Sequence, residues 1–244
     1  MRKVFLEKDQ KRIAQMFNRI STTYDLLNHL LSGGMDIWWR HKAVSSVGLS
    51  AGQKILDVAT GTGDLAFAAL KSQPQTCVIG IDIAELMLLR AKRKRKSKGI
   101  DRESYQLVAG DATSLPFIDS SFDAVICAYG IRNMAAVGKA IEEFYRVLKP
   151  GGKLLILEFG LPRNPCFRAI YLFYFEKILP AVGGLIAGDQ VAYKYLPNSV
   201  ETFITANQLA EQLAPRFKVM LIQHLLGGIT YFLKAVKQDY ESSI

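Results

Sequence analysis

The sequence predicts an α/β fold built on a mostly parallel, doubly wound sheet. Three observations predict it: apolar runs alternate with helix-like segments over residues 54–159, a glycine-rich loop follows the first run, and acids close several of the runs. Strands that alternate with helices form parallel sheets with helices on both faces. At 244 residues the chain is long enough for a large core, and we expect residues 1–244 to form a single domain.

The first 50 residues are predicted to be helical. Their apolar side chains recur three or four residues apart, which is the spacing of one helix face. The first such stripe contains Ile13, Met16, Phe17 and Ile20, and the second contains Leu26, Leu27, Leu30 and Leu31. We expect residues 1–50 to form a helical segment ahead of the sheet.

Five apolar strands are predicted next, at residues 55–58, 78–81, 105–108, 124–128 and 154–159. Residues 137–148 are predicted to form a helix, because Pro150, Gly151 and Gly152 stop it. The end of the chain has a different pattern. Residues 219–223 and 229–236 are both strand-like with a Gly227-Gly228 turn between them, which predicts an antiparallel hairpin at the sheet edge.

Residues 161–215 form an insertion between the fifth strand and this hairpin. One helical face of the insertion carries Phe167, Ile170, Tyr171, Tyr174 and Ile178, and charged residues interrupt the run. The segment is therefore too polar to span a bilayer. Its aromatic stripe has two interpretations, a core face or a cover over an apolar substrate. Residues 180–188 are expected to form a flexible, apolar loop.

The glycine loop after the first strand predicts a cofactor site. Gly61-x-Gly63-x-x-Ala66 matches the dinucleotide fingerprint, but such a match alone is weak. Four acids, at Asp57, Asp64, Asp82 and Asp111, adjoin the carboxyl ends of strands, where ligands of such sheets bind. A pyrophosphate avoids nearby carboxylates, whereas the ammonium and sulfonium groups of S-adenosylmethionine suit them. Each acid alone is equally a helix cap or turn residue.

The formal charge of +9 is concentrated in residues 90–98, at the end of a predicted helix. This run is interpreted either as a solvated helix end or as a surface that attracts anionic lipid headgroups. No aromatic residue interleaves with the cations, which disfavours a role in nucleic-acid binding.

The three cysteines lie far apart, which indicates a protein of the reducing cytoplasm. The three histidines lack metal-ligand spacing, so we expect no metal site.

A mostly parallel sheet that ends in a hairpin is similar to the class I S-adenosylmethionine-dependent methyltransferases. Within that class, five motifs share one further resemblance: Tyr24-Asp25-Leu26-Leu27-Asn28 with Ser32 and Trp39-Arg40, residues 111–117 with 121–123, Gly130-Ile131-Arg132-Asn133, residues 146–152 with Glu158, and residues 195–200. Together these motifs resemble the ubiquinone/menaquinone biosynthesis C-methyltransferases over nearly the whole chain.

The resemblance implies transfer of a methyl group from S-adenosylmethionine to a ring carbon of a prenylated hydroquinone, demethylmenaquinol above all. It implies catalytic roles for Arg132, which would stabilise a quinol oxyanion, and for Asn133. The implied cofactor-binding residues are Gly61, Thr62, Gly63, Asp82, Asp111 and Ala112, and Tyr24 and Asn28 would belong to an N-terminal lid over the substrate. A polyprenyl tail implies contact with the membrane surface by a cytoplasmic enzyme.

Four positions depart from the family pattern: Leu27 replaces the usual Met, Asp36 a common His, Gly160 a common Ser, and Ala128 a Ser of some members. Two alternatives stay open. One is methylation of a benzoquinol, another lipid-like phenol or a sterol. The other is a basic nucleic-acid-binding or assembly protein without turnover. The proton-accepting base and the oligomeric state, including a homodimer, stay open as well.

Overall fold

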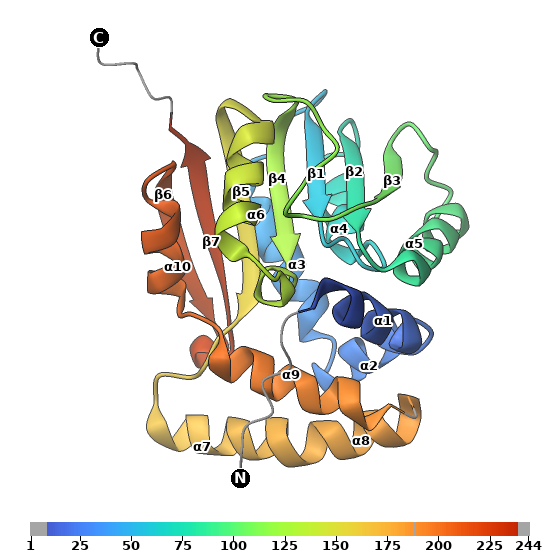
Figure 1. The fold of residues 1–244 in the computed structure, drawn as a ribbon, viewed down its shortest axis with the longest axis vertical. Coiled ribbons are helices and arrows are strands. Elements are labelled where there is room, and N and C mark those ends of the chain that lie inside the picture. The colour runs from blue at the N-terminus through green and yellow to red at the C-terminus, as the bar shows by residue number, and fades with distance from the viewer. Residues whose placement is uncertain (1–8, 188, 239–244) are drawn as a thin grey trace.

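A seven-stranded sheet organises residues 9–187 and 189–238, the part of the chain that our computed structural model describes. The strands are β1 (Lys54–Val58), β2 (Cys77–Asp82), β3 (Tyr105–Ala109), β4 (Phe122–Ala128), β5 (Leu148–Phe159), β6 (Phe217–Leu225) and β7 (Thr230–Lys237). Their order is β3-β2-β1-β4-β5-β7-β6 (Figure 1). Strands β1 to β5 pair in parallel, and β7 is antiparallel to both β5 and β6.

The predicted hairpin is therefore present, and β7 lies inside the sheet while β6 forms the edge. The order of strand addition reverses at β1, because β2 and β3 lie on one side of β1 and β4 and β5 lie on the other. Such a reversal opens a crevice beyond the carboxyl ends of the strands. The fold thus places a ligand site at the end of β1, where the glycine loop begins.

Helices cover both faces of the sheet. On one face α3 (Met35–Val47) and α4 (Asp64–Ser72) pack on the strands, and on the other α6 (Val137–Val147) and α10 (Ala206–Leu213) do so. The central strands are apolar on both sides, as a doubly covered parallel sheet requires. Side chains such as Ile55 and Leu56, adjacent in β1, enter the two opposite cores.

Two further groups of helices lie beyond the carboxyl ends of the parallel strands (Figure 1). The first comprises α1 (Gln10–Ile20) and α2 (Tyr24–Leu31). The second, from the insertion, comprises α7 (Pro165–Phe173), a π-helical segment (Tyr174–Ile178), α8 (Leu179–Ala187) and α9 (Gln190–Thr202). Buried apolar side chains from both groups, including Ile20, Leu27, Phe175 and Val200, form a third core. The N-terminal segment and the insertion therefore pack against each other over the sheet edge.

The structure corrects the expected loop at residues 180–188. Residues 179–187 form helix α8, and residue 188 lies outside the described residues. Pro180 comes just after the π-helical segment Tyr174–Ile178, where the regular i→i−4 ladder of hydrogen bonds is already interrupted. The apolar face predicted for the insertion is not uniformly buried: Tyr171 is buried, whereas Ile170 is 67% exposed.

The basic helix α5 (Glu85–Ser97) is only partly a solvated surface. Arg95 is buried and donates to the Tyr105 carbonyl at 2.7 Å. Lys94 forms ion pairs with Asp25 at 2.9 Å and Asp64 at 2.5 Å. Two cations of the run therefore hold the fold together rather than face solvent. Among the described residues, every helix is too short or too polar to cross a bilayer.

Candidate active site

A crevice opens at the carboxyl ends of β1, β2, β3 and β4, where the topology predicts a ligand site. Of the residues predicted to bind a cofactor, Gly61, Asp82, Asp111 and Ala112 line it, and Tyr24 and Asn133 join them. Ala128, one of the departures from the family pattern, also lies on its wall. The described lining contains two acids and no Lys or Arg side chain.

Asp82 holds the glycine loop in place from the end of β2. Its carboxylate accepts from the backbone N–H of Gly61 at 2.8 Å and from that of Ala84 at 2.8 Å. Burial raises the pKa of Asp82, and these N–H donors oppose the rise. Gly61 has a φ of +56°, and a Cβ built there would meet no atom within 4 Å. The loop therefore presents open space beside a fixed carboxylate.

Thr62 and Gly63 do not line this crevice. The Thr62 hydroxyl is buried and donates to Asp25 of α2 at 2.5 Å. Gly63 begins α4 with a φ of +92°, and a Cβ there would lie 2.8 Å from the Tyr105 hydroxyl. Gly63 therefore shapes the loop, and Thr62 connects it to the N-terminal helices. Asp111, by contrast, faces the crevice and accepts from Gln10 of α1 at 3.0 Å.

The crevice fits S-adenosylmethionine better than a dinucleotide. Two carboxylates and no cation suit the ammonium and sulfonium groups, whereas a pyrophosphate seeks amide donors and few acids. Asp82 follows the loop by about 20 residues, the place of an acid that binds ribose hydroxyls. The open space at Gly61 lets a ligand approach the backbone closely.

A second cavity, of about 220 Å³, lies between α1, α2, α3 and the insertion helices. Its wall is mainly apolar and aromatic: Met16, Phe17, Ile20, Leu31, Trp39, Tyr129, Phe159, Tyr171, Tyr174, Phe175, Leu179, Tyr195, Leu196 and Ile229 contribute. A few polar groups, at Tyr24, Asn28, Asp36, Arg40 and Arg132, face the same space. We call this space the acceptor cavity. Its chemistry suits a large apolar molecule with a polar head.

The cofactor crevice and the acceptor cavity adjoin each other. Three aromatic side chains, those of Phe17, Tyr24 and Tyr129, line both. Tyr129 is buried and has a φ of +56°, an uncommon conformation for a residue with a side chain. Such backbone strain concentrates at functional sites. Tyr129 could not be predicted as a site residue, because nothing in an Ala-Tyr-Gly sequence indicates a left-handed tyrosine.

Arg132 and Asn133 stand at this junction on a single 3-10 turn after β4. The Arg132 guanidinium lines the acceptor cavity and pairs with Glu158 at 2.7 Å. It also donates to the Tyr129 carbonyl at 2.5 Å. Asn133 faces the cofactor crevice, and its Oδ1 accepts from the Tyr195 hydroxyl at 3.0 Å. The pair predicted to be catalytic thus lies between the two cavities.

Gly160 and Asp36 differ from the residues common in the family, and the structure shows the surroundings of both. A Cβ at Gly160 would lie 2.7 Å from the Gly228 carbonyl oxygen, so a Ser at this position would require the backbone to shift. Asp36 is buried and meets His29 Nδ1 at 2.9 Å and the Ser32 hydroxyl at 2.8 Å. It also forms an ion pair with Arg40.

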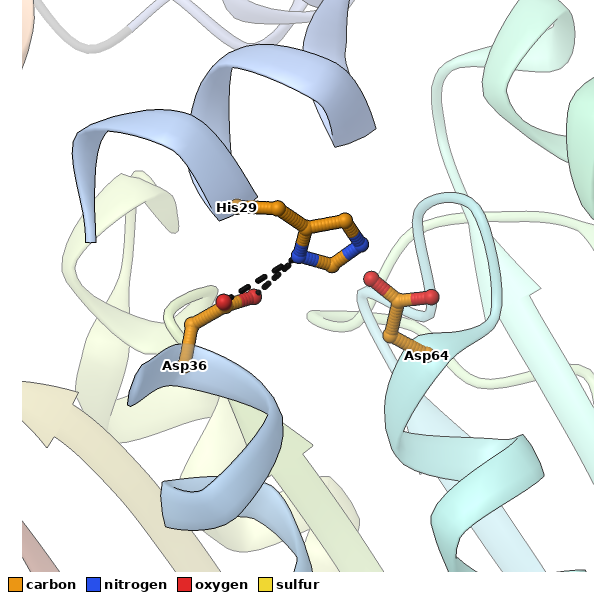
Figure 2. Close-up of side chains that lie close together, drawn as sticks. All are labelled: His29, Asp36 and Asp64. Carbon is orange, nitrogen blue, oxygen red and sulfur yellow. Dashed lines mark hydrogen bonds and ion pairs between the residues drawn. The ribbon is translucent and has the colours of Figure 1, made fainter. Parts of the chain in front are cut away.

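His29, Asp36 and Asp64 come together from three helices, with one ligand atom of each within 4.8 Å of the others (Figure 2). The spacing of these three residues in the sequence does not match a known metal-binding pattern. Arg40 and Lys94 already pair with the two carboxylates. These cations supply the positive charge that a metal ion would bring, so we interpret the group as an ion-pair network.

The sheet with its single antiparallel strand and the acid-rimmed crevice over a glycine loop define an S-adenosylmethionine-dependent methyltransferase. The comparison with known families agrees. The chain belongs to the ubiE/COQ5 methyltransferase family, whose sequence model matches residues 5–237.

Curated relatives support this assignment. A demethylmenaquinone methyltransferase of Thermus thermophilus is 46% identical over 199 residues, which cover 82% of this chain and 89% of the relative. A ubiquinone/menaquinone biosynthesis C-methyltransferase UbiE of Bdellovibrio bacteriovorus is 39% identical over 224 residues, 91% of this chain and 94% of the relative. The alternative of a nucleic-acid-binding or assembly protein without turnover thereby loses its basis.

Solved structures share the fold. A SAM-dependent methyltransferase from Aquifex aeolicus matches with a TM-score of 0.60 and 19% identity, over 81% of this chain and 89% of that one. The [4+2]-cyclase SpnF matches with a TM-score of 0.69 and 18% identity, over 93% and 95%. At such identities the likeness concerns the fold alone.

Proposed function

We propose that this enzyme transfers the methyl group of S-adenosylmethionine to a ring carbon of a prenylated quinol, with demethylmenaquinol as the preferred acceptor. The observation that supports this most is the acceptor cavity itself, which adjoins the cofactor crevice at Phe17, Tyr24 and Tyr129. Its aromatic wall suits a flat ring with an apolar tail. The two curated relatives named above carry out, by their names, methylation in menaquinone or ubiquinone biosynthesis.

The chain would act as one unit over residues 1–244, with residues 1–50 as a lid and residues 161–215 as a second cover. Tyr24 and Asn28 of α2 line the acceptor cavity. The lid is tied to the glycine loop, because Asp25 accepts from Thr62 and pairs with Lys94. A lid held in this way would exclude water from the reacting atoms and strengthen the electrostatic interactions inside.

When bound, S-adenosylmethionine supplies an electrophilic methyl group on a sulfonium. A ring carbon becomes nucleophilic when a neighbouring hydroxyl carries negative charge. Arg132 would stabilise that oxygen, since its guanidinium lines the acceptor cavity and stays protonated. Asn133 would orient the ring from the cofactor side, held by Tyr195. Gly61, Asp82, Asp111 and Ala112 would hold the cofactor so that carbon and methyl lie in line.

A prenyl tail dissolves in the bilayer, so we propose peripheral contact with the cytoplasmic face of an anionic membrane. Two surfaces fit this role. Helix α5 exposes Lys92, Arg93 and Lys96, and α7 exposes Ile170 (67%) and Phe173 (61%). Cations attract anionic headgroups and apolar side chains enter the interface.

A panel of acceptors tests the proposed function. Pure protein is incubated with S-adenosylmethionine and with tail-shortened forms of demethylmenaquinol, a demethylated ubiquinone-type benzoquinol, a simple phenol and a sterol. We expect the highest kcat/KM with the naphthoquinol. A higher value for the benzoquinol would reverse the order of the two quinols, and turnover of the phenol or sterol alone would refute a quinol acceptor.

A further inference from the structure

We propose that Asp36 is the proton acceptor of the reaction and that His29 is the positioning residue that holds it and connects it to solvent. This inference rests on the proposed quinol acceptor and deepens it. It concerns the step that neither Arg132 nor Asn133 can perform, because a guanidinium and an amide do not take up a proton at neutral pH.

The reaction releases one proton overall. The hydroxyl proton that leaves when the quinol becomes an oxyanion is regained when the product oxygen becomes a hydroxyl again, so the hydrogen that is lost comes from the ring carbon. When the ring carbon forms its bond to the methyl group, the bond from sulfur to that methyl breaks and its electron pair stays on sulfur. The ring carbon then carries both a methyl group and its original hydrogen. Loss of that hydrogen as a proton returns the C–H electron pair to the ring and restores aromaticity. A carboxylate is basic enough for this step, since the aromatic product drives it.

Asp36 is the one carboxylate among the described residues that line the acceptor cavity. Burial raises the pKa of all five tyrosines on its wall, so these hydroxyls keep their protons: Tyr24, Tyr129, Tyr171, Tyr174 and Tyr195. Arg40 and Arg132 stay protonated. Glu158 is fully buried behind Arg132 and does not line the cavity. The wall therefore offers a single ionised oxygen base.

The surroundings of Asp36 keep it ionised. Although burial raises its pKa, the charge of Arg40 and the hydrogen bonds from Ser32 and His29 hold the pKa below its ordinary value. Arg40 also lies over the Tyr129 ring, with its guanidinium carbon 5.4 Å from the ring centroid. Tyr129 lines both cavities, so the ion-pair partner of Asp36 packs against a side chain at the junction of the two.

His29 links Asp36 to the outside of the molecule. Its Nδ1 lies 2.9 Å and 3.1 Å from the two Asp36 oxygens. Its side chain is 35% exposed and lines a separate surface hollow with Asp64 and Lys94. Figure 2 shows the ring between the carboxylates of Asp36 and Asp64. The imidazole thus spans the wall between the acceptor cavity and solvent, and it gives the proton a route out.

The test compares Asp36→Asn and Asp36→Ala with the parent enzyme. Asp36→Asn should lower kcat by at least ~100-fold, the lower range for loss of a general base. The Kd values for S-adenosylmethionine and for a tail-shortened naphthoquinone should stay within about twofold, as no direct contact is lost. Quenching of Trp39, which is buried in the cavity wall, reports naphthoquinone binding without turnover. Formate should restore turnover to Asp36→Ala in a concentration-dependent manner, because it returns a carboxylate to the vacated space.

Asp36→Glu is a second variant that we expect to fold even if Asp36→Asn does not, because it keeps a negative charge opposite Arg40. It moves the carboxylate by one methylene and should lower kcat at least ~10-fold at unchanged Kd. Asp119→Asn, at a side chain that is 75% exposed, is the matched control and should behave as the parent. A parent-like kcat for Asp36→Asn or Asp36→Glu, or no rescue of Asp36→Ala by formate, would overturn the proposal. If the parent itself fails to methylate the quinol, the proposed function fails instead.

Discussion

Arg132 and Glu158 form a buried ion pair between the 3-10 turn after β4 and the end of β5, with Arg132 Nη1 2.7 Å from Glu158 Oε1. Both side chains are almost fully buried. Arg132, the residue that the resemblance implies to be catalytic, is therefore also a member of an ion pair. Glu158 neutralises and orients a guanidinium that still faces the acceptor cavity.

Arg132→Lys tests the role of the planar guanidinium. The ammonium keeps the charge opposite Glu158 but loses the fork that also reaches the Tyr129 carbonyl and Ser199. We expect kcat to fall on the order of 100-fold, as for loss of one oxyanion donor, with S-adenosylmethionine affinity nearly intact. Arg216→Lys, which keeps its partial exposure beside Glu142, is the control. Turnover of Arg132→Lys at the parent rate would make Arg132 a structural residue.

Asp57 should make stability depend on pH. Burial raises its pKa from 3.8 to about 7. Between these values the folded chain binds more protons than the unfolded chain, so the free energy of unfolding falls as pH rises from about 4 to 7. Each pKa unit corresponds to about 1.4 kcal/mol, which gives a loss on the order of 2–3 kcal/mol from pH 5 upward.

Urea unfolding at pH 5 and pH 8 without cofactor measures this effect, with Asp57→Asn as the comparison. The variant keeps an acceptor for the Thr60 hydroxyl, which donates to Asp57 at 2.5 Å. It should lose less stability than the parent over this interval. Equal losses in the two proteins would show that Asp57 is ionised in the folded chain at pH 5.

Asp82→Asn should weaken S-adenosylmethionine binding. The amide keeps the shape of a side chain that also holds the loop through Gly61 and Ala84, but it loses the charge. One charge-assisted hydrogen bond is worth about 1.5–3 kcal/mol, so the Kd should rise at least ~10-fold. Calorimetry measures it, and a thermal melt checks folding. The exposed Asp101→Asn is the control, and an unchanged Kd for Asp82→Asn would remove Asp82 from the site.

Membrane contact is tested with the exposed cations of α5. Lys92, Arg93 and Lys96 are changed together to Gln, while Lys94 and Arg95 stay because they hold the fold. Each basic group near an anionic surface is worth about 1 kcal/mol, so sedimentation with anionic vesicles should drop markedly. High salt should weaken the parent likewise.

The matched control for this variant changes Lys139 of α6, Arg216 just before β6 and Lys218 of β6, and both elements lie away from α5 (Figure 1). It should bind vesicles as the parent does. If the parent ignores anionic vesicles, or both triple variants lose binding equally, α5 has no specific role at the membrane.

Much of the fold could be predicted because it is encoded locally. Apolar runs such as Ile55 and Leu56, the glycine loop and the Gly227-Gly228 turn each specify their element through nearby residues. The loop expected at residues 180–188 was wrong because tertiary packing of α8 outweighs the low helix propensity of two glycines.

The site was only partly predictable from the sequence. Asp82 and Asp111 follow strands, so topology alone brings them to one crevice. The network of His29, Asp36 and Asp64 joins three helices, and no sequence spacing encodes such a contact. Likewise the basic run in α5 hides two structural cations, because a charge pattern does not reveal which side chains turn inward.

The most direct test of the central claim is the position of the transferred methyl group. Parent enzyme is incubated with S-adenosylmethionine that carries ¹³C in its methyl group and with tail-shortened demethylmenaquinol, and the product is analysed by NMR. The account predicts one new ¹³C signal from a methyl on a ring carbon, with no O-methyl signal. A label on a quinol oxygen, or no labelled quinone product from folded enzyme that binds the cofactor, would contradict it.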